Sequence, residues 1–188
     1  MFDQKLFILI NKIMLKIGIC GAHGTGKTTL AREIAEIYNL PIISQLMRNF
    51  WQEYGVMDFE KLPKDVRTTF QKESLLRQID AEDSTDDFVT DRTVLDQIAY
   101  TKMSSNMAGV DLAIYEQLCR ERLERYTHLI YLPIEFDVEA EFLRADINSR
   151  DDLAIVMKDY LDKWFKGRFI EITGTLEQRK TKLKEILT

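Results

Sequence analysis

A glycine-rich stretch near the start of the chain has the residue types that bind phosphate. Residues 21–28 read GAHGTGKT and satisfy the pattern GxxxxGK[ST] in full. Glycines let the backbone curl so that its N–H groups face an anion, and the N-terminus of a following helix adds positive partial charge. In such a loop the lysine reaches the β- and γ-phosphates of a nucleoside triphosphate, and the hydroxyl after it binds Mg²⁺. We therefore predict a phosphate cradle formed by Gly21, Ala22, His23, Gly24, Thr25, Gly26, Lys27, Thr28 and Thr29. His23 occupies a free position of the pattern, and we expect its ring to face solvent.

A second group of candidate residues ends the run FVTD, residues 88–91. If this strand lies beside the strand that carries the glycine loop, Asp91 meets the Mg²⁺–phosphate region and joins Thr28 as a metal ligand. The alternative role for Asp91 is a helix N-cap, but Thr93 with Asp96 three residues later has the spacing of a capping box and leaves Asp91 free. The guanidinium of Arg92 suits an acceptor phosphate or charge on a transferred group. Its alternative role is a surface salt bridge.

The chain supplies the elements that this arrangement needs. The apolar run 15–20 predicts a strand before the loop, and residues 28–38 have the periodicity of an amphipathic helix. Four more short apolar runs predict strands, and longer helical segments separate them. That alternation predicts an α/β fold with a five-stranded parallel sheet and helices on both faces. The later strands are expected at 41–44, 88–91, 128–132 and 168–173, and the later helices at 45–54, 63–82, 93–103, 111–125, 137–166 and after Gly174.

Composition limits the class of protein. The chain has 188 residues, of which 45% are hydrophobic and 30% charged, as in one ordinary globular domain. A net charge of −5 offers no bulk attraction to nucleic acid or to an anionic membrane. Cys20 and Cys119 form no CxxC pair, and so little cysteine fits a reducing cytoplasm. The acidic run 80–87 is expected to be a solvated helix end and loop.

The first residues are set apart from the predicted domain. The apolar run LFILI within residues 1–13 is too short to span a bilayer, and no small-residue cleavage site follows it. We treat residues 1–13 as an N-terminal extension and residues 14–188 as a single domain.

The glycine loop and the run DFVTDRTVLDQIAYT, residues 87–101, together resemble the P-loop nucleoside and nucleotide kinases. Thymidylate kinases carry Asp-Arg after the third strand, as Asp91-Arg92 does here. The chain is most similar to the AAA-type ATPase group that includes ribosylnicotinamide kinases and many phage kinases, including deoxynucleotide kinases. This resemblance implies a three-layer P-loop kinase fold with a helical lid, and ATP and Mg²⁺ as cofactors.

The resemblance also places a Glu-x-x-Arg motif after the second strand. Residues 44–48 read SQLMR, so Arg48 matches the motif and Gln45 replaces its acid. In nucleoside kinases that acid looks like the base that takes the proton from the attacking hydroxyl, which an amide cannot do. Either Asp91 is the base, or the acceptor already carries a phosphate and needs no strong base. An ordinary polar helix start is the alternative for Gln45 and Arg48.

The remaining candidates come from the long helix and from the lid. The resemblance implies a glutamine on the helix at 63–82 that binds the acceptor base, and a spacing of seven puts Gln71 and Gln78 on one face. A polar, solvent-facing stripe is an equally good interpretation of that pair. Arg144 and Arg150 lie where the lid arginines of this fold close over the phosphates. A charged helical hairpin is their alternative.

These residues favour a kinase that moves the γ-phosphoryl group of ATP to a nucleoside monophosphate, with a deoxynucleotide preferred. Lys27, Asp91, Arg92, Arg144 and Arg150 are its predicted catalytic residues. The alternatives are a nucleoside or ribosylnicotinamide kinase, and a nucleotide-binding regulatory ATPase. The expected partner is a small-molecule acceptor, without nucleic acid or membrane; a homodimer is left open, and the expected location is cytoplasmic.

Overall fold

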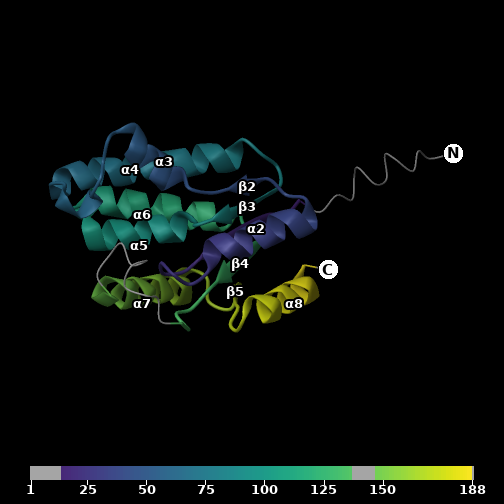
Figure 1. Cartoon of the computed structure of the whole chain (residues 1–188). Coiled ribbons are helices and arrows are strands. Elements are labelled where there is room, and N and C mark those ends of the chain that lie inside the picture. The colour runs from purple at the N-terminus through teal and green to yellow at the C-terminus, as the bar shows by residue number, and fades with distance from the viewer. Residues whose placement is uncertain (1–13, 137–146, 188) are drawn as a thin grey trace.

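A computed structural model describes residues 14–136 and 147–187 of the chain. Within these residues a single sheet has the strand order β2-β3-β1-β4-β5, and every neighbouring pair is parallel (Figure 1). All five predicted strands are present. Their bounds are β1 Lys16–Cys20, β2 Ile42–Ile43, β3 Phe88–Asp91, β4 His128–Tyr131 and β5 Phe169–Glu171.

Helices separate the strands, as the alternating pattern predicts. Their bounds are α2 Lys27–Tyr38, α3 Leu46–Glu53, α4 Lys64–Asp83, α5 Val94–Ser104, α6 Gly109–Leu123, α7 Ile147–Trp164 and α8 Leu176–Ile186. A short 3₁₀ helix, η1 Phe59–Lys61, was not expected from the sequence. The helix expected at 137–166 is seen only as α7, because residues 137–146 lie outside the described part of the chain, as do residues 1–13.

The sheet is the middle layer of three. On one face α2 and α8 contribute Leu30, Ile34 and Leu183 to a buried cluster with Ile17 and Ile19 of β1. On the other face Phe88 of β3 and Leu129 of β4 pack in a second cluster with side chains of α4, α5, α6 and α7. Figure 1 shows α2 and α8 together on one side of the strands. Helices thus cover both faces, as the predicted fold class requires.

The sheet brings the two sequence motifs to one edge. β1 is central, between β3 and β4, and its carboxyl end leads into the glycine loop. The parallel register pairs Ile19 of β1 with Asp91, the last residue of β3. The acid-bearing strand therefore lies beside the loop-bearing strand, which confirms that prediction.

The acidic run 80–87 is the predicted helix end and loop, with Asp80, Asp83 and Asp86 exposed, but Glu82 is an exception. Glu82 is only 2% exposed and accepts hydrogen bonds from Gln78 Nε2 at 2.7 Å and from the Tyr126 hydroxyl at 2.5 Å. Asp83 pairs with Arg122 at 2.8 Å. Tyr126 and Arg122 come from other parts of the chain, so Glu82 and Asp83 anchor the end of α4. None of the helices in the described ranges has both the length and the apolar content of a membrane span.

Candidate active site

The glycine loop turns tightly between β1 and α2. Gly21, Gly24 and Gly26 have φ values of 146°, 72° and 89°, which side chains rarely permit. A Cβ atom on Gly21 would lie 2.4 Å from the carbonyl oxygen of Leu132, so the loop passes directly against the backbone after β4. The glycines of the pattern are therefore required by the local backbone.

Lys27 is the first residue of α2, and its side chain turns back toward the loop. It is 7% exposed, and its Nζ donates to the carbonyl oxygens of Gly21 and Ala22, each at 2.7 Å. Burial lowers the pKa of Lys27, and the carboxyl group of Asp96 acts in the opposite direction. The ammonium group is thus held at the loop by backbone contacts that a phosphate can replace.

The two predicted metal ligands are in contact. Thr28 Oγ1 donates to Asp91 Oδ2 at 2.6 Å. A hydroxyl and a carboxylate are hard oxygen donors, and Mg²⁺ in proteins uses one or two such ligands together with water and substrate phosphates. No group of three or more His, Cys, Asp or Glu in the described ranges is arranged to hold a metal by itself. The donor set therefore fits Mg²⁺ bound jointly with a nucleotide.

Arg92 follows in a strained backbone conformation. Its φ is 93°, outside the usual range for a residue with a side chain, and such strain is concentrated at functional sites. Its guanidinium carbon lies 5.4 Å from the centre of the Tyr100 ring. Thr93 and Asp96 form the predicted capping box at the start of α5, which confirms that Asp91 is not the cap. Asp96 uses Oδ2 in this capping box, and its Oδ1 is buried with no hydrogen-bond partner in the described residues.

His23 is not the solvent-facing residue that we expected. Its side chain is half-buried, and its Nε2 atom is buried without a hydrogen-bond partner among the described residues. Burial lowers the pKa of His23 from 6.5 to about 4, and the nearby charges of Lys27, Arg150 and Arg92 act in the same direction. The ring is thus neutral and surrounded by positive charge. Thr29, in the first turn of α2, is exposed.

Of the two predicted lid arginines, Arg150 reaches the loop. It lies in α7, is 5% exposed, and donates from Nε to His23 O at 2.9 Å and from Nη2 to Phe136 O at 3.0 Å. Residue 144 lies outside the described part of the chain, so the role of Arg144 stays a prediction. Arg150 is therefore beside the phosphate cradle and not in an exposed hairpin.

Gln45 and Arg48 lie at the start of α3 and are both exposed. Gln45 adopts a left-handed conformation with φ of 59°. In the described structure no hydrogen bond or ion pair ties either side chain to the glycine loop or to Asp91. Their assignment to the acceptor stays a prediction.

Gln71 and Gln78 share one face of α4, but that face is not a solvent-facing stripe, because each side chain is 2% exposed. The amide of Gln78 donates to Glu82 at 2.7 Å and to Thr90 Oγ1 at 3.0 Å, so it braces the end of β3. Gln71 donates to Ser104 at 3.2 Å, while its Oε1 is buried without a partner in the described residues. Of the two glutamines, Gln71 is therefore the better candidate for a hydrogen bond to the acceptor.

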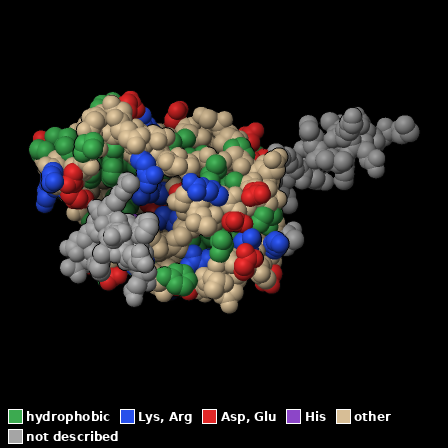
Figure 2. Space-filling model, viewed as in Figure 1, with side chains coloured by type: hydrophobic (Ala, Val, Ile, Leu, Met, Phe, Trp, Pro, Cys, Tyr) green, Lys and Arg blue, Asp and Glu red, His purple; other side chains and the backbone are tan. Residues whose placement is uncertain are grey.

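Basic side chains are concentrated here even though the chain as a whole is acidic. Lys and Arg side chains gather near the middle of the face shown in Figure 2, between α4 and α7. Sequence reasoning missed one arginine at the glycine loop, Arg179 of α8, which donates to Thr25 O at 2.6 Å. Its signal was weak: it is an arginine in the first turns of a helix that follows the sheet's last strand.

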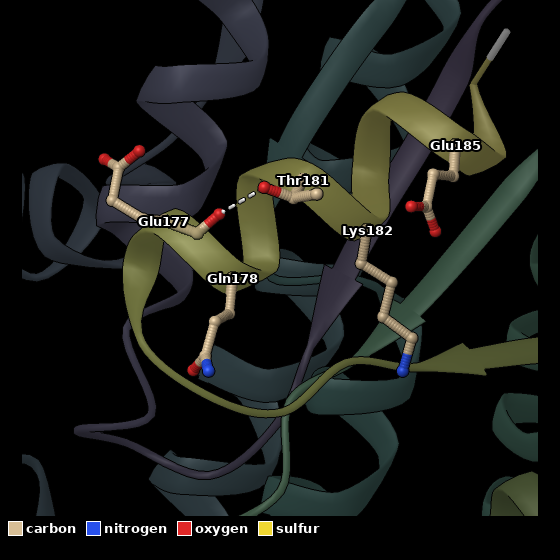
Figure 3. A pocket seen from close by; sticks show the side chains of 5 residues that line it. All are labelled: Glu177, Gln178, Thr181, Lys182 and Glu185. Carbon is tan, nitrogen blue, oxygen red and sulfur yellow. Dashed lines mark hydrogen bonds between the residues drawn. The ribbon is translucent and has the colours of Figure 1, made fainter.

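A surface hollow of about 320 Å³ lies on the outer side of α8. Figure 3 shows that its lining comes from this helix alone. The lining residues are Glu177, Gln178, Thr181, Lys182 and Glu185. All five are exposed, and none belongs to the predicted site, so we place the chemistry at the glycine loop and not in this hollow.

The fold and the loop are shared with solved kinase structures. A parallel sheet of this strand order, with a complete GxxxxGKT loop after its central strand, is the fold of the P-loop nucleoside and nucleotide kinases. Residues 16–179 match the family model described as an AAA domain. Because this match spans most of the chain, the protein belongs to that AAA domain family.

Solved structures of similar fold bind nucleosides and nucleotides. A NadR protein in complex with NR has a TM-score of 0.69 at 17% identity, covering 92% of this chain and 50% of that chain. A deoxyadenosine kinase from M. mycoides, with products dCMP and dCDP bound, has a TM-score of 0.65 at 16% identity, covering 92% and 99%. The YorR protein from Bacillus subtilis, in complex with phosphorylated GDP, has a TM-score of 0.51 at 14% identity, covering 91% and 92%.

Identities this low establish the fold alone, and the present chain spans about half the length of the NadR chain. No curated protein sequence matches the chain significantly. The activity must therefore be argued from the site.

Proposed function

We propose that this protein is an ATP-dependent phosphotransferase whose acceptor is a nucleoside monophosphate, with a deoxynucleotide preferred. The observation that carries the proposal is the contact between Thr28 and Asp91 at 2.6 Å, directly after Lys27 in the glycine loop. This contact joins a hydroxyl and a carboxylate from separate motifs, next in the chain to the loop lysine, and phosphoryl transfer uses all three groups.

The donor side of the site is complete in these residues. Lys27 would exchange its carbonyl contacts for the β- and γ-phosphates, and the loop N–H groups would bind phosphate oxygens. Thr28 and Asp91 would hold Mg²⁺ through their oxygens, and the ion would neutralise charge on the two terminal phosphates. Arg92 and Arg150 would bring positive charge to the group in transit.

The choice of acceptor rests on the two positions where a base was expected, Gln45 and Asp91. In the transfer, the bond from the γ-phosphorus to the β–γ bridging oxygen breaks, a bond to an acceptor oxygen forms, and ADP leaves. A hydroxyl acceptor must also lose a proton, but Asp91 already contacts Thr28 and Gln45 cannot accept one. A monophosphate presents an oxygen that is already ionised. The site therefore suits a monophosphate better than a nucleoside.

A nucleoside kinase is the second candidate. Two of the similar structures favour it, the NadR protein with NR and the deoxyadenosine kinase. Asp91 would then act as the base. In either case we assign recognition of the acceptor base to Gln71, whose buried Oε1 has no partner in the described residues.

The test is release of ADP from ATP with and without acceptors. We expect release to depend on the acceptor across a panel of nucleosides and nucleoside monophosphates. Slow hydrolysis that no acceptor accelerates would contradict the proposal and would favour a regulatory ATPase.

A further inference from the structure

The buried guanidinium group of Arg179 joins three separate segments of the chain. Arg179 lies in α8 and is 4% exposed. Its Nη1 donates to Thr25 O at 2.6 Å, its Nε to Gly174 O at 2.8 Å, and its Nη2 to Glu135 Oε2 at 2.8 Å. One side chain therefore ties the glycine loop to the segment after β4 and to the turn before α8.

The partners of Arg179 are themselves fixed. Both carboxylate oxygens of Glu135 accept from the backbone N–H of Gly174, at 2.9 and 3.0 Å. The ring of Phe136 lies 5.7 Å from the guanidinium carbon. Three nitrogens of a planar, rigid group are thus each matched to an acceptor, an arrangement that a lysine cannot reproduce.

The contact with Thr25 has a consequence for the next residue. In a trans peptide the C=O of one residue and the N–H of the next point in opposite directions, and the described residues contain no cis peptide. Because Arg179 holds the carbonyl of Thr25 on the α8 side, the N–H of Gly26 is directed away from α8. Gly26, at φ 89°, has no Cβ atom that would limit rotation of the peptide before it. The hydrogen bond from Arg179 to Thr25 O supplies that restriction.

The same relation holds two residues earlier in the loop. Arg150 donates to His23 O at 2.9 Å, which fixes the orientation of the Gly24 N–H in the same way. The approach of Arg179 is also close, since a Cβ on Gly26 would lie 3.2 Å from its Nη1. Two buried arginines from different helices thus hold alternate peptide planes of the loop.

We propose that Arg179 is a positioning residue that presets the Gly26 N–H toward the phosphates of the nucleotide, so that binding need not order this peptide. The inference deepens the proposed function and rests on it, since it assumes that the loop binds ATP. It assigns Arg179 no contact with the nucleotide. Its effect should therefore appear in affinity for ATP and not in affinity for the acceptor.

The experiment compares Arg179→Met and Arg179→Lys with the matched control Arg168→Met. Arg168 is an exposed arginine whose nitrogens pair with Glu124 at 2.6 and 2.8 Å, far along the chain from the loop. For each variant we would measure the Kd of Mg·ATP by calorimetry, the KM for each substrate, kcat and the melting temperature.

We expect Arg179→Met to raise the Kd and KM for ATP about tenfold or more, because three charge-assisted hydrogen bonds are lost. The KM for the acceptor should stay within about twofold, on the same argument that no acceptor contact changes. Arg179→Lys keeps the charge beside Glu135 and preserves the fold, yet it should still bind ATP more weakly than wild type. Arg168→Met should bind ATP as wild type does.

Two results would overturn the inference in distinguishable ways. If Arg179→Lys is folded and binds ATP with wild-type affinity, Arg179 has only a structural role, and the proposed kinase function stands. If the wild-type protein itself fails to bind Mg·ATP, the proposed function fails first and the inference fails with it.

Discussion

Lys27 and Asp91 bring opposite charges to one end of the sheet, and each has a separate task. Within residues 14–136 and 147–187, the ammonium group of Lys27 has only backbone carbonyl partners, at 2.7 Å. Asp91 contacts the hydroxyl of Thr28. Because neither is engaged in a strong ion pair with the other, both remain able to meet a phosphate and its cation.

Replacing Lys27 with alanine should abolish most turnover. The loss removes the positive charge that meets the β- and γ-phosphates, and we expect kcat/KM to fall by about 10²–10³-fold. The control is Lys61→Ala, since that side chain is 83% exposed and belongs to η1. Equal loss of activity in both variants, or none in Lys27→Ala, would contradict the P-loop assignment.

Replacing Asp91 with asparagine should reduce kcat and raise the Mg²⁺ concentration needed for half-maximal rate. The amide keeps the size of the side chain but removes the charge that holds the cation, so the fold should survive, as circular dichroism would show. We expect a loss of about 10²-fold at fixed Mg²⁺. Asp111→Asn, at an exposed position, is the matched control. A wild-type Mg²⁺ dependence in Asp91→Asn would remove Asp91 from the metal site.

His23 should report on the charge in the loop. Its pKa of about 4 in the folded chain lies below the 6.5 of an unperturbed histidine, so the unfolded chain binds more protons between these values. Stability supplied by His23 is therefore full above about pH 6.5 and is lost as the pH falls toward 4.

NMR titration of the His23 ring measures this pKa directly, and His128 is the other histidine in the chain. We expect Mg·ADP to raise the pKa of His23, because phosphate charge offsets that of Lys27, Arg150 and Arg92. In His23→Asn the fall in melting temperature between pH 7 and pH 5 should be smaller than in wild type. An unshifted apo pKa near 6.5 would contradict the described burial of the ring.

At the scale of elements, the glycine loop depends on its close approach to the chain after β4. Gly21→Ala places a Cβ 2.4 Å from Leu132 O at a φ of 146°. The matched control is Gly55→Ala, where φ is also positive, at 64°, but nothing lies within 4 Å. The first variant should lose about 2 kcal/mol more unfolding free energy than the second, since it adds a backbone clash to a φ that is less accessible to alanine. Equal losses in denaturant titrations would show that the loop can move away from β4.

The elements themselves were largely predictable, because their signals are local. The five apolar runs, the capping box at Thr93 and the loop between β1 and α2 each appear in a short window of sequence. The adjacency of β1 and β3 followed from the fold class and placed Asp91 beside Thr28.

What could not be predicted depends on contacts between distant residues. Glu82 belongs to an acidic run that predicts solvent exposure. Its carboxylate is nevertheless buried, and it accepts a hydrogen bond from the Tyr126 hydroxyl, 44 positions away. Arg179 reaches Thr25 across 154 positions. Gln71 and Gln78 lie on the same face of α4, so the sequence cannot tell them apart. In the structure the amide of Gln78 donates to Thr90 at the end of β3, whereas Gln71 Oε1 has no partner in the described residues.

At the scale of the whole molecule, one sheet edge collects the loop after β1, the acid after β3 and the arginines of α7 and α8. The net charge of the chain is −5, so the positive charge at this edge is a local feature. Such a site can select a small ligand with several negative charges, because the positive side chains interact with those charges at short range. This arrangement is what the proposed two-substrate phosphotransferase would use.

The most direct test is the comparison of kcat/KM for deoxynucleoside monophosphates with that for the matching deoxynucleosides, at saturating Mg·ATP, with products identified by mass spectrometry. The account predicts nucleoside diphosphate as the product and a kcat/KM at least about tenfold higher for one or more monophosphates. Efficient conversion of a nucleoside to its monophosphate, with no diphosphate formed, would contradict it.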